Sequence, residues 1–206
     1  MARRRDTFAS ALASLRLRAH RGEFAPGQAV VVVEEARRLR MSHTPVREAL
    51  ACLCGEGLIE RSPNEGFLYP RLDVAIIRDR LRFRLALLQM SLDAGSVVPS
   101  EARPGSPSSL IALQQRLARL VRAQGNVALY DAYRRVAGQL AALRQVEKRV
   151  FDDVEVEAAQ LVSILTTGSP QQGASALDVY HQRRIEAAPY LLLDVEGDPP
   201  LFQGKG

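Results

Sequence analysis

The sequence predicts a mostly α-helical protein in which only the N-terminal third adds β-structure. Over most of its 206 residues, apolar side chains recur every three or four positions, which is the spacing of one buried helix face. Clusters of glycine and proline, such as 25–27 and 168–170, fall between these periodic segments rather than inside them. Two short alternating segments, 58–61 and 66–69, flank the turn-rich sequence Ser-Pro-Asn-Glu and indicate a β-hairpin.

Three helices are expected before the hairpin. The first covers residues 7–21, where apolar positions recur at helical spacing until Gly22 ends the pattern. The apolar run 30–33 is too short to distinguish a strand from the start of a helix, and 34–39 then has helical composition. A third helix is expected from residue 44 or 45 to about residue 56. Two short helices joined by a tight turn form a helix-turn-helix.

The start of the third helix is suited to bind an anion. Ser42 is a candidate N-cap, Pro45 lies in the first turn, and Arg47 lies one turn into the helix. Four apolar residues share one face of this helix and four polar residues lie nearer the other: Val46, Ala49, Leu50 and Leu53 against His43, Thr44, Arg47 and Glu48. With the hairpin behind it, the unit is predicted to be a winged helix-turn-helix, whose hairpin tip is able to reach the sugar-phosphate backbone or the minor groove of DNA.

Residues 71–73 are expected to link this DNA-binding domain (1–70) to an all-α domain (74–206). The second domain is predicted as a helical bundle of about five helices, because apolar stripes alternate with a loop at 97–109 and a break at 168–170. Its expected helices are 74–94, 110–124, a third that begins near 126, and a last one at 171–188; 145–165 fits either a continuation of the third or a bend. Such a bundle can form a small-molecule pocket, a dimer interface or both.

The composition favours double-stranded nucleic acid as a partner. Lysine and arginine (28) outnumber aspartate and glutamate (23), and the resulting net charge of +5 suits a polyanion. Aromatic residues make up only 5% and tryptophan is absent, which argues against stacking platforms for single strands. No run approaches the ~20 apolar residues of a membrane span and no signal-peptide core is present, so a cytoplasmic location without membrane contact is expected. Cys52 and Cys54 are expected as reduced thiols, buried or half-buried.

Residues 6–70 resemble the GntR family of bacterial transcriptional regulators. The resemblance is carried by Glu-Phe-Ala-Pro-Gly at 23–27, by Ser-His-Thr-Pro-Val-Arg-Glu-Ala-Leu at 42–50, and by Glu-Gly-Leu-Ile at 56–59. It implies a repressor that binds a pseudo-palindromic operator as a homodimer. It further implies that Thr44 contacts a phosphate or base edge and Arg47 a guanine or phosphate. The DNA-binding residues expected on this basis are Ser42, His43, Thr44, Arg47, Asn64 and Gly66.

Two positions depart from the family pattern. His43 stands where the family commonly has arginine, and Val33 occupies a site where the fatty-acid-responsive branch carries a DNA-contacting arginine. A mostly neutral imidazole changes base preference and lowers the salt-dependent share of binding, so the operator sequence cannot be taken from relatives. Simpler roles are open for three of the residues: helix capping for Ser42, a surface ion pair for Arg47, and turn geometry for Gly66.

The helical remainder is similar to the FCD type of effector domain, in a shortened form. Arg84 matches a family arginine that often lines the pocket. Many FCD domains hold a divalent metal with one Asp and three His, but here the expected Asp-x-x-aromatic-His pattern reads Asp-Ala-Tyr-Arg-Arg from Asp131, and His181 is the domain's single histidine. No metal and no cofactor is therefore expected. A small organic acid is the expected effector, and the candidate residues that bind it are Arg84, Asp131, Arg134, Arg135 and His181.

Two alternatives stand beside the regulator. An enzyme is disfavoured, because no Ser-His-Asp arrangement, phosphate-binding glycine loop or metal-ligand spacing can be assembled from the sequence. The acidic residues between 147 and 157 are accordingly expected to form a solvated helix face. The other alternative is a regulator or protein-interaction module whose helical domain only dimerises and has lost ligand sensing.

Overall fold

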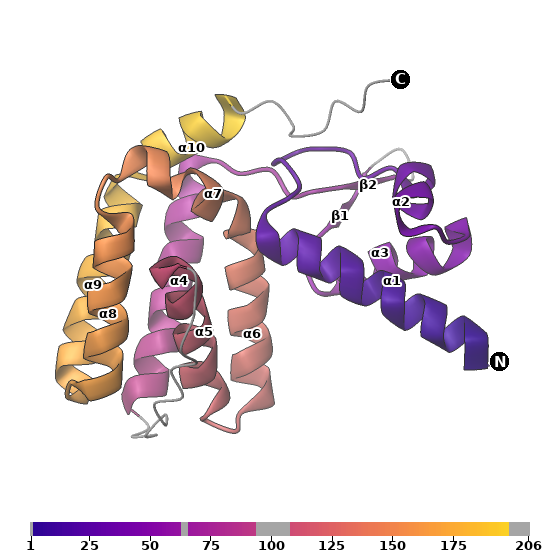
Figure 1. Ribbon diagram of the computed structural model, residues 1–206. Helices are drawn as coiled ribbons and strands as arrows, with labels where there is room; N and C mark the ends of the chain where they lie inside the picture. Colours follow the sequence, from indigo (N-terminus) through magenta and orange to yellow (C-terminus); the bar gives the residue numbers. More distant parts are fainter. Residues whose placement is uncertain (1, 63–65, 94–107, 198–206) are drawn as a thin grey trace.

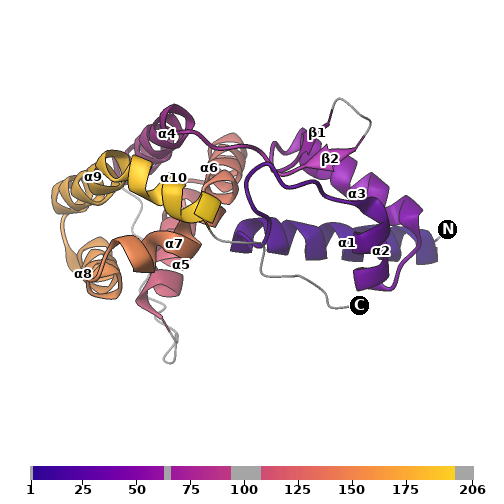
Figure 2. The ribbon, with the colours of Figure 1, turned by 90° about the horizontal axis from the view of Figure 1, so that it is seen from above.

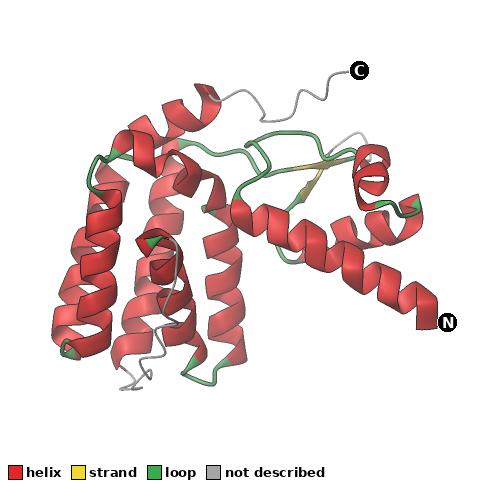
Figure 3. Ribbon diagram, in the orientation of Figure 1, coloured by secondary structure: helices red, strands yellow, loops and turns green. Residues whose placement is uncertain are grey.

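The computed structural model describes residues 2–62, 66–93 and 108–197. These residues form two units that lie side by side, an N-terminal unit of helices with a small hairpin and a larger bundle of helices (Figure 1, Figure 2). Nearly all of the elements are helices, and the two strands of the hairpin are short (Figure 3). The mostly α-helical fold expected from the sequence is thus confirmed. None of the described helices is both long and apolar enough to cross a membrane.

The N-terminal unit has the predicted order of elements. Its helices are α1 (Ala2–Arg21), α2 (Val32–Leu39) and α3 (His43–Gly55). Strands β1 (Glu60–Arg61) and β2 (Phe67–Leu68) pair in antiparallel register to form the wing. The ambiguous run 30–33 is the entry to a helix and not a strand: Val30 N–H donates to Phe67 O at 2.8 Å beside the hairpin, and α2 begins at Val32.

A single apolar core holds α3 in place. Its predicted apolar face is fully buried and packs on α1, through Val46, Ala49, Leu50 and Leu53. Next to it, the rings of Phe24 and Tyr69 stack with their centroids 5.9 Å apart. The N-terminus of α3 is therefore carried by a fixed helix rather than by a loop.

The bundle contains more helices than the sequence predicts. Seven are present in the described part, against about five expected: α4 (Val74–Asp93), α5 (Ser109–Arg122), α6 (Val127–Gln139), α7 (Ala141–Val150), α8 (Val154–Thr167), α9 (Pro170–Glu186) and α10 (Ala188–Gly197). The stop expected near Gly125 is present, because Gly125 has a φ of +67° and the Asn126 side chain accepts from the Leu129 N–H at 3.0 Å to begin α6. Of the expected loop 97–109, residues 97–107 lie outside the described residues, and Ser109 already belongs to α5.

Three features account for the additional helices. The helix that begins near 126 ends at Gln139, and Leu140 separates α6 from α7. The segment 145–165 bends, because Phe151 is extended (φ −127°, ψ 116°) and separates α7 from α8. The expectation that the helix before Pro189 is the last one is wrong, since α10 follows it. Pro189 lies in the first turn of α10, where its missing N–H would have had no helical partner in any case.

Side chains from one unit bind backbone carbonyls of the other where the two units meet. Tyr69 Oη donates to Gly138 O at 3.0 Å, and Gln139 Nε2 donates to Gly57 O at 2.8 Å. Both bonds join the end of the helix-turn-helix or hairpin to α6. The hydrogen bonds therefore fix the orientation of the N-terminal unit on the bundle.

Two glycines allow the units to approach closely. A Cβ at Gly22 would lie 2.6 Å from Ala141 O, and Gly22 also has a left-handed φ of +71°. A Cβ at Gly138 would lie 2.4 Å from a methyl carbon of Leu58. A side chain at Gly22 would have to displace backbone of the other unit, whereas one at Gly138 would require the Leu58 and His20 side chains to shift.

Candidate nucleic-acid interface

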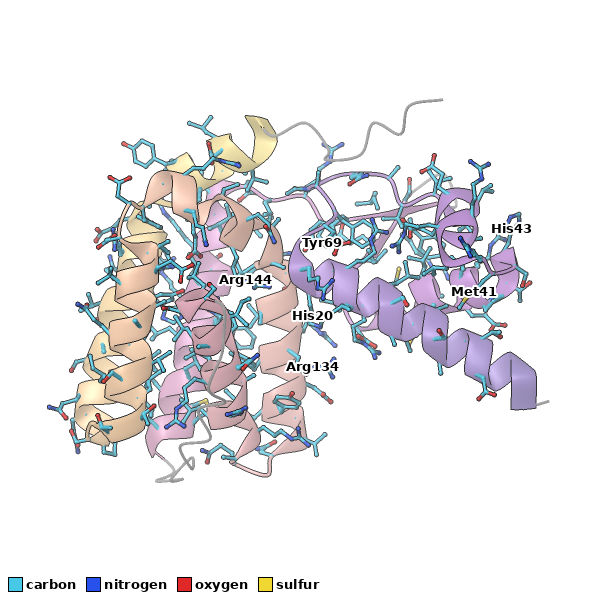
Figure 4. The ribbon with its side chains drawn as sticks, viewed as in Figure 1. His20, Met41, His43, Tyr69, Arg134 and Arg144 are labelled. Atoms are coloured by element: carbon cyan, nitrogen blue, oxygen red, sulfur yellow. The ribbon has the colours of Figure 1, made fainter. Side chains whose placement is uncertain are left out.

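The polar side chains at the start of α3 are exposed to solvent. His43, Thr44 and Arg47 are all exposed, while Pro45 and Val46 between them are buried. Figure 4 shows His43 at the end of the N-terminal unit that lies farthest from the bundle. The start of α3 is therefore open to a partner as large as a DNA duplex, and the partial positive charge of a helix N-terminus adds to its attraction for phosphate.

The alternative role of Ser42 as a capping side chain is not supported. Ser42 occupies the N-cap position with extended backbone (φ −71°, ψ 162°), but its hydroxyl makes no capping hydrogen bond to the described residues. The side chain is exposed beside His43. Its hydroxyl is thus able to donate to a phosphate.

Sequence reasoning missed a basic group next to this helix start. Arg40 ends α2 in a left-handed conformation with a φ of +54°, and it lies two residues before Ser42. Arg37 and Arg40 are both exposed. The signal that could have identified them is the concentration of arginine in the turn between the two helices, because such turns run close to the DNA backbone when α3 lies in the groove.

The wing is only partly described. Asn64, a predicted DNA-binding residue, lies outside the described residues. Gly66 is half-buried, and its carbonyl oxygen accepts a hydrogen bond from the Ser62 N–H at 3.0 Å. A Cβ at Gly66 would lie 3.7 Å from Ser62 Cβ, which is an ordinary contact distance. Arg61, at the base of the wing, is exposed and lies over the Phe67 ring.

The thiols differ from the expectation of burial. Cys52 is exposed and Cys54 is half-buried, and the two thiols form no disulfide with each other. The expectation for Cys52 is therefore wrong, because Cys52 lies on the outward side of α3 whereas its neighbour Leu53 points into the core.

The five candidate ligand-binding residues fall into two separate places. Arg84 and His181 meet inside the bundle, where Arg84 Nε donates to His181 Nε2 at 3.0 Å. His181 Nδ1 lies 2.7 Å from Leu177 O and donates to it, so the ring is neutral. Burial, together with the neighbouring Arg84, lowers the pKa of His181 well below its ordinary value. Both nitrogens of this imidazole are in use, which leaves neither for a metal ion.

An ion-pair cluster lies next to this pair and corrects the interpretation of the acidic run. Arg184 Nη2 donates to Glu147 Oε2 at 2.9 Å and to Glu157 Oε2 at 2.8 Å. Glu147 is only 4% exposed, so it belongs to the interior and not to a solvated face. A buried carboxylate needs a charged partner, and Arg184 supplies it. Among the described residues, no group of three or more His, Cys, Asp or Glu side chains could hold a metal ion.

The other three candidates lie at the junction of the two units. Asp131, Arg134 and Arg135, all on α6, line a cavity of about 190 Å³. Its remaining walls come from the N-terminal unit, through His20, Glu56 and Leu58. Figure 4 shows His20 and Arg134 near one another below the C-terminal end of α1.

The chemistry of His20 makes the junction sensitive to acid. Burial, with Arg134 and Arg144 nearby, lowers the pKa of His20 to about 4. An unfolded histidine titrates near 6.5. Between about pH 6.5 and pH 4 the unfolded chain therefore binds a proton that the folded chain does not, so stability falls as the pH falls through this window.

We expect the free energy of unfolding to drop by about 1–2 kcal/mol between pH 7 and pH 5 on account of His20. Urea unfolding at the two pH values measures the drop. His20→Gln cannot take up this proton, so the variant should lose less stability than the wild type on acidification. The loss that remains in the variant includes the contribution of His181, whose pKa is also lowered. An equal loss in wild type and variant would contradict the assignment.

Comparisons with known proteins agree with these features. Residues 9–68 match the model of the family described as bacterial regulatory proteins, gntR family. An uncharacterized HTH-type transcriptional regulator in an unstable DNA locus of Streptomyces ambofaciens is 40% identical over 82 residues, which are 40% of this chain and 34% of that protein. The HTH-type transcriptional regulator McbR of Escherichia coli is 30% identical over 105 residues, 50% of this chain and 44% of McbR. The chain thus spans less than half the length of these curated relatives.

Similarity to solved structures extends over both units. The structure of E. coli McbR/YncC covers 89% of this chain and 97% of its own, with a TM-score of 0.69 and 16% identity. A GntR transcriptional regulator from Rhodococcus sp. RHA1 covers 90% of this chain and 97% of its own, with a TM-score of 0.66 and 16% identity. At this identity the likeness shows the fold alone. Residues 9–68, which form the helix-turn-helix and the hairpin here, are thus similar to the helix-turn-helix domain of the gntR family of bacterial regulatory proteins.

Proposed function

We propose that the chain is a transcriptional repressor that binds a pseudo-palindromic operator in duplex DNA as a homodimer. The observation that carries the proposal is the start of α3, where His43, Thr44 and Arg47 are exposed on a helix whose opposite face is fully buried. A recognition helix needs both properties, because base readout requires side chains that are accessible and held in one orientation. The proposed DNA-binding residues are Ser42, His43, Thr44, Arg47, Asn64 and Gly66, with Arg40 added as a backbone contact.

Dimerisation is proposed to use the bundle. On α4, Phe83 is 50% exposed and Met90 is 59% exposed, and they lie two turns apart on one face with Ala86 between them. An exposed apolar stripe of this kind is typical of an interface, and two half-sites on one duplex require two recognition helices. We propose residues 71–73 as the linker between the DNA-binding domain and this dimerising domain.

We assign the bundle to the FCD type of effector domain and propose a small organic acid as its effector. Arg84 supports this proposal, because its side chain is 2% exposed and its Nη2 finds no hydrogen-bond partner among the described residues. An unpaired buried guanidinium nitrogen is costly, and a carboxylate ligand would satisfy it. The competing proposal, a bundle that only dimerises, is favoured by the neighbouring Arg184, whose charge is already balanced by Glu147 and Glu157.

Substitution of Arg47 tests the DNA-binding proposal. We expect Arg47→Ala to weaken binding to a duplex from the upstream region of the chain's own gene by about 1–3 kcal/mol and to relax its sequence preference. Fluorescence anisotropy with the specific duplex and a scrambled one measures both effects. Arg122→Ala removes an exposed arginine from α5, away from the α4 stripe, and should leave binding unchanged. If Arg47→Ala binds both duplexes as the wild type does, α3 does not read the operator.

A further inference from the structure

We propose that the junction cavity, the space lined by His20, Glu56 and Leu58 of the N-terminal unit and by Asp131, Arg134 and Arg135 of α6, is a binding site for a small dicarboxylate. This site is separate from the bundle interior around Arg84, and it does not depend on the proposed DNA-binding function. The proposal rests on the geometry of the cavity, on its charge and on its size.

Both units contribute walls to the cavity. Arg135 connects them directly, since its stem carbon Cδ would lie 3.2 Å from a Cβ at Gly57 and its Nη2 donates weakly to Gly55 O at 3.4 Å. Gln139, one turn further along α6, donates to Gly57 O. The cavity therefore exists only while the units are docked, so a ligand that fills it favours the docked arrangement.

The charge on the cavity wall is unbalanced toward positive. Glu56 is already neutralised by Arg16, which contacts it with two nitrogens, one of them at 2.9 Å. Neither Arg134 nor Arg135 forms an ion pair with any described residue, although both residues line the cavity. The lining therefore includes two arginines without an ion pair to the described residues and one exposed aspartate, Asp131. Guanidinium groups bind carboxylates with strong, charge-assisted hydrogen bonds.

The spacing of the two arginines indicates a ligand with two carboxylates. Successive residues on a helix point about 100° apart, so Arg134 and Arg135 cannot both form a bidentate pair with one and the same carboxylate. The charge of Arg134 also acts on the opposite wall of the cavity, because it contributes to lowering the pKa of His20 and of Glu56. His20 is thus neutral near pH 7, and its ring offers a further N–H group without adding charge.

The volume limits the ligand to a small molecule. The cavity holds about 190 Å³, which is below the roughly 300 Å³ at which drug-sized sites begin. A dicarboxylic acid of three or four carbons is matched to a site of this size.

Thermal unfolding of the full chain with sodium malonate as the probe tests the site. We expect saturating malonate to raise the Tm by about 5 °C or more over sodium chloride at equal ionic strength, and to exceed the effect of acetate. Arg134→Gln and Arg135→Gln, made separately, should each weaken malonate binding at least about tenfold by calorimetric titration. Arg82→Gln on α4 is the matched control and should bind malonate as the wild type does. If either Arg134→Gln or Arg135→Gln fails to fold, the other variant still tests the site.

Three results would overturn the proposal. They are a Tm unaffected by malonate, an equal effect of acetate, and binding that persists unchanged in both arginine variants. Operator binding by Arg134→Gln in the absence of malonate is measured in parallel. Because the cavity adjoins the C-terminal end of α3 and not the exposed start at His43, Thr44 and Arg47, this binding should be retained, so failure of the dicarboxylate site and failure of the DNA-binding function give different results.

Discussion

Replacement of Arg184 by leucine is expected to lower the free energy of unfolding by about 3–5 kcal/mol. The side chain is fully buried and is the partner of Glu147, which is itself 4% exposed. Burial opposes the charged form, but Tyr180 and the two carboxylates outweigh it and raise the pKa of Arg184. Without the arginine, Glu147 is left as an uncompensated buried charge. Urea unfolding followed by circular dichroism measures the change.

The neighbouring arginine provides the control. Arg183 pairs with Asp153 and Glu157 but lies at the surface, with 34% of its side chain exposed. Arg183→Leu should therefore cost no more than about 1 kcal/mol. If Arg184→Leu proves as mild as Arg183→Leu, the cluster does not hold the bundle together.

Substitution of Gly22 is expected to separate the two units. In Gly22→Ala, the new Cβ would lie 2.6 Å from a backbone oxygen, Ala141 O, which cannot turn aside as a side chain can. The left-handed φ of +71° adds strain for any residue with a Cβ. We expect a total cost of about 2–4 kcal/mol, measured by thermal unfolding, with faster proteolysis of the 71–73 linker.

Gly125→Ala separates the two contributions to this cost. Gly125 has a nearly equal φ of +67°, but nothing lies within 4 Å of its Cβ position. Its substitution should cost only the conformational share, about 1–2 kcal/mol. Equal costs for the two variants would show that the junction around Gly22 contributes no packing energy.

The N-terminal unit could be predicted closely because its signals are local. The proline of the first turn and the apolar face of α3 are sufficient to define the helix, and Ser-Pro-Asn-Glu marks the turn of the hairpin. The predicted exposure of His43, Thr44 and Arg47 follows from the same helical period.

The bundle was harder to predict, because its breaks are made by tertiary packing. Neither glycine nor proline occurs near Phe151, which leaves helical conformation to bury its ring, at 7% exposure, beneath Arg183 and Arg184. In the sequence, Glu147 is one of several acidic residues with nothing to distinguish it. Its partner Arg184 is 37 positions away, and only the fold brings the two side chains together. The proline at position 189 is compatible with the end of the helix before it and equally with the first turn of a new helix after it.

The candidate ligand residues show the same limit. The resemblance to a family selected Arg84, His181 and the Asp131–Arg135 segment as one group, but the structure places them at two sites. The position of α6 explains this: its residues Tyr133 and Val136 point into the bundle, whereas Arg134 and Arg135 point toward the N-terminal unit. How two domains dock is not contained in the periodicity of either one.

Footprinting of the DNA upstream of the chain's own gene tests the central claim, that the chain reads an operator through α3 as a homodimer. We expect the wild type to protect two half-sites related by a dyad, centred about 10 base pairs or a multiple of this apart, and Arg47→Ala to lose this protection at the same protein concentration. A wild type that protects no sequence at low salt, or a single asymmetric site that Arg47→Ala still protects, would contradict the account.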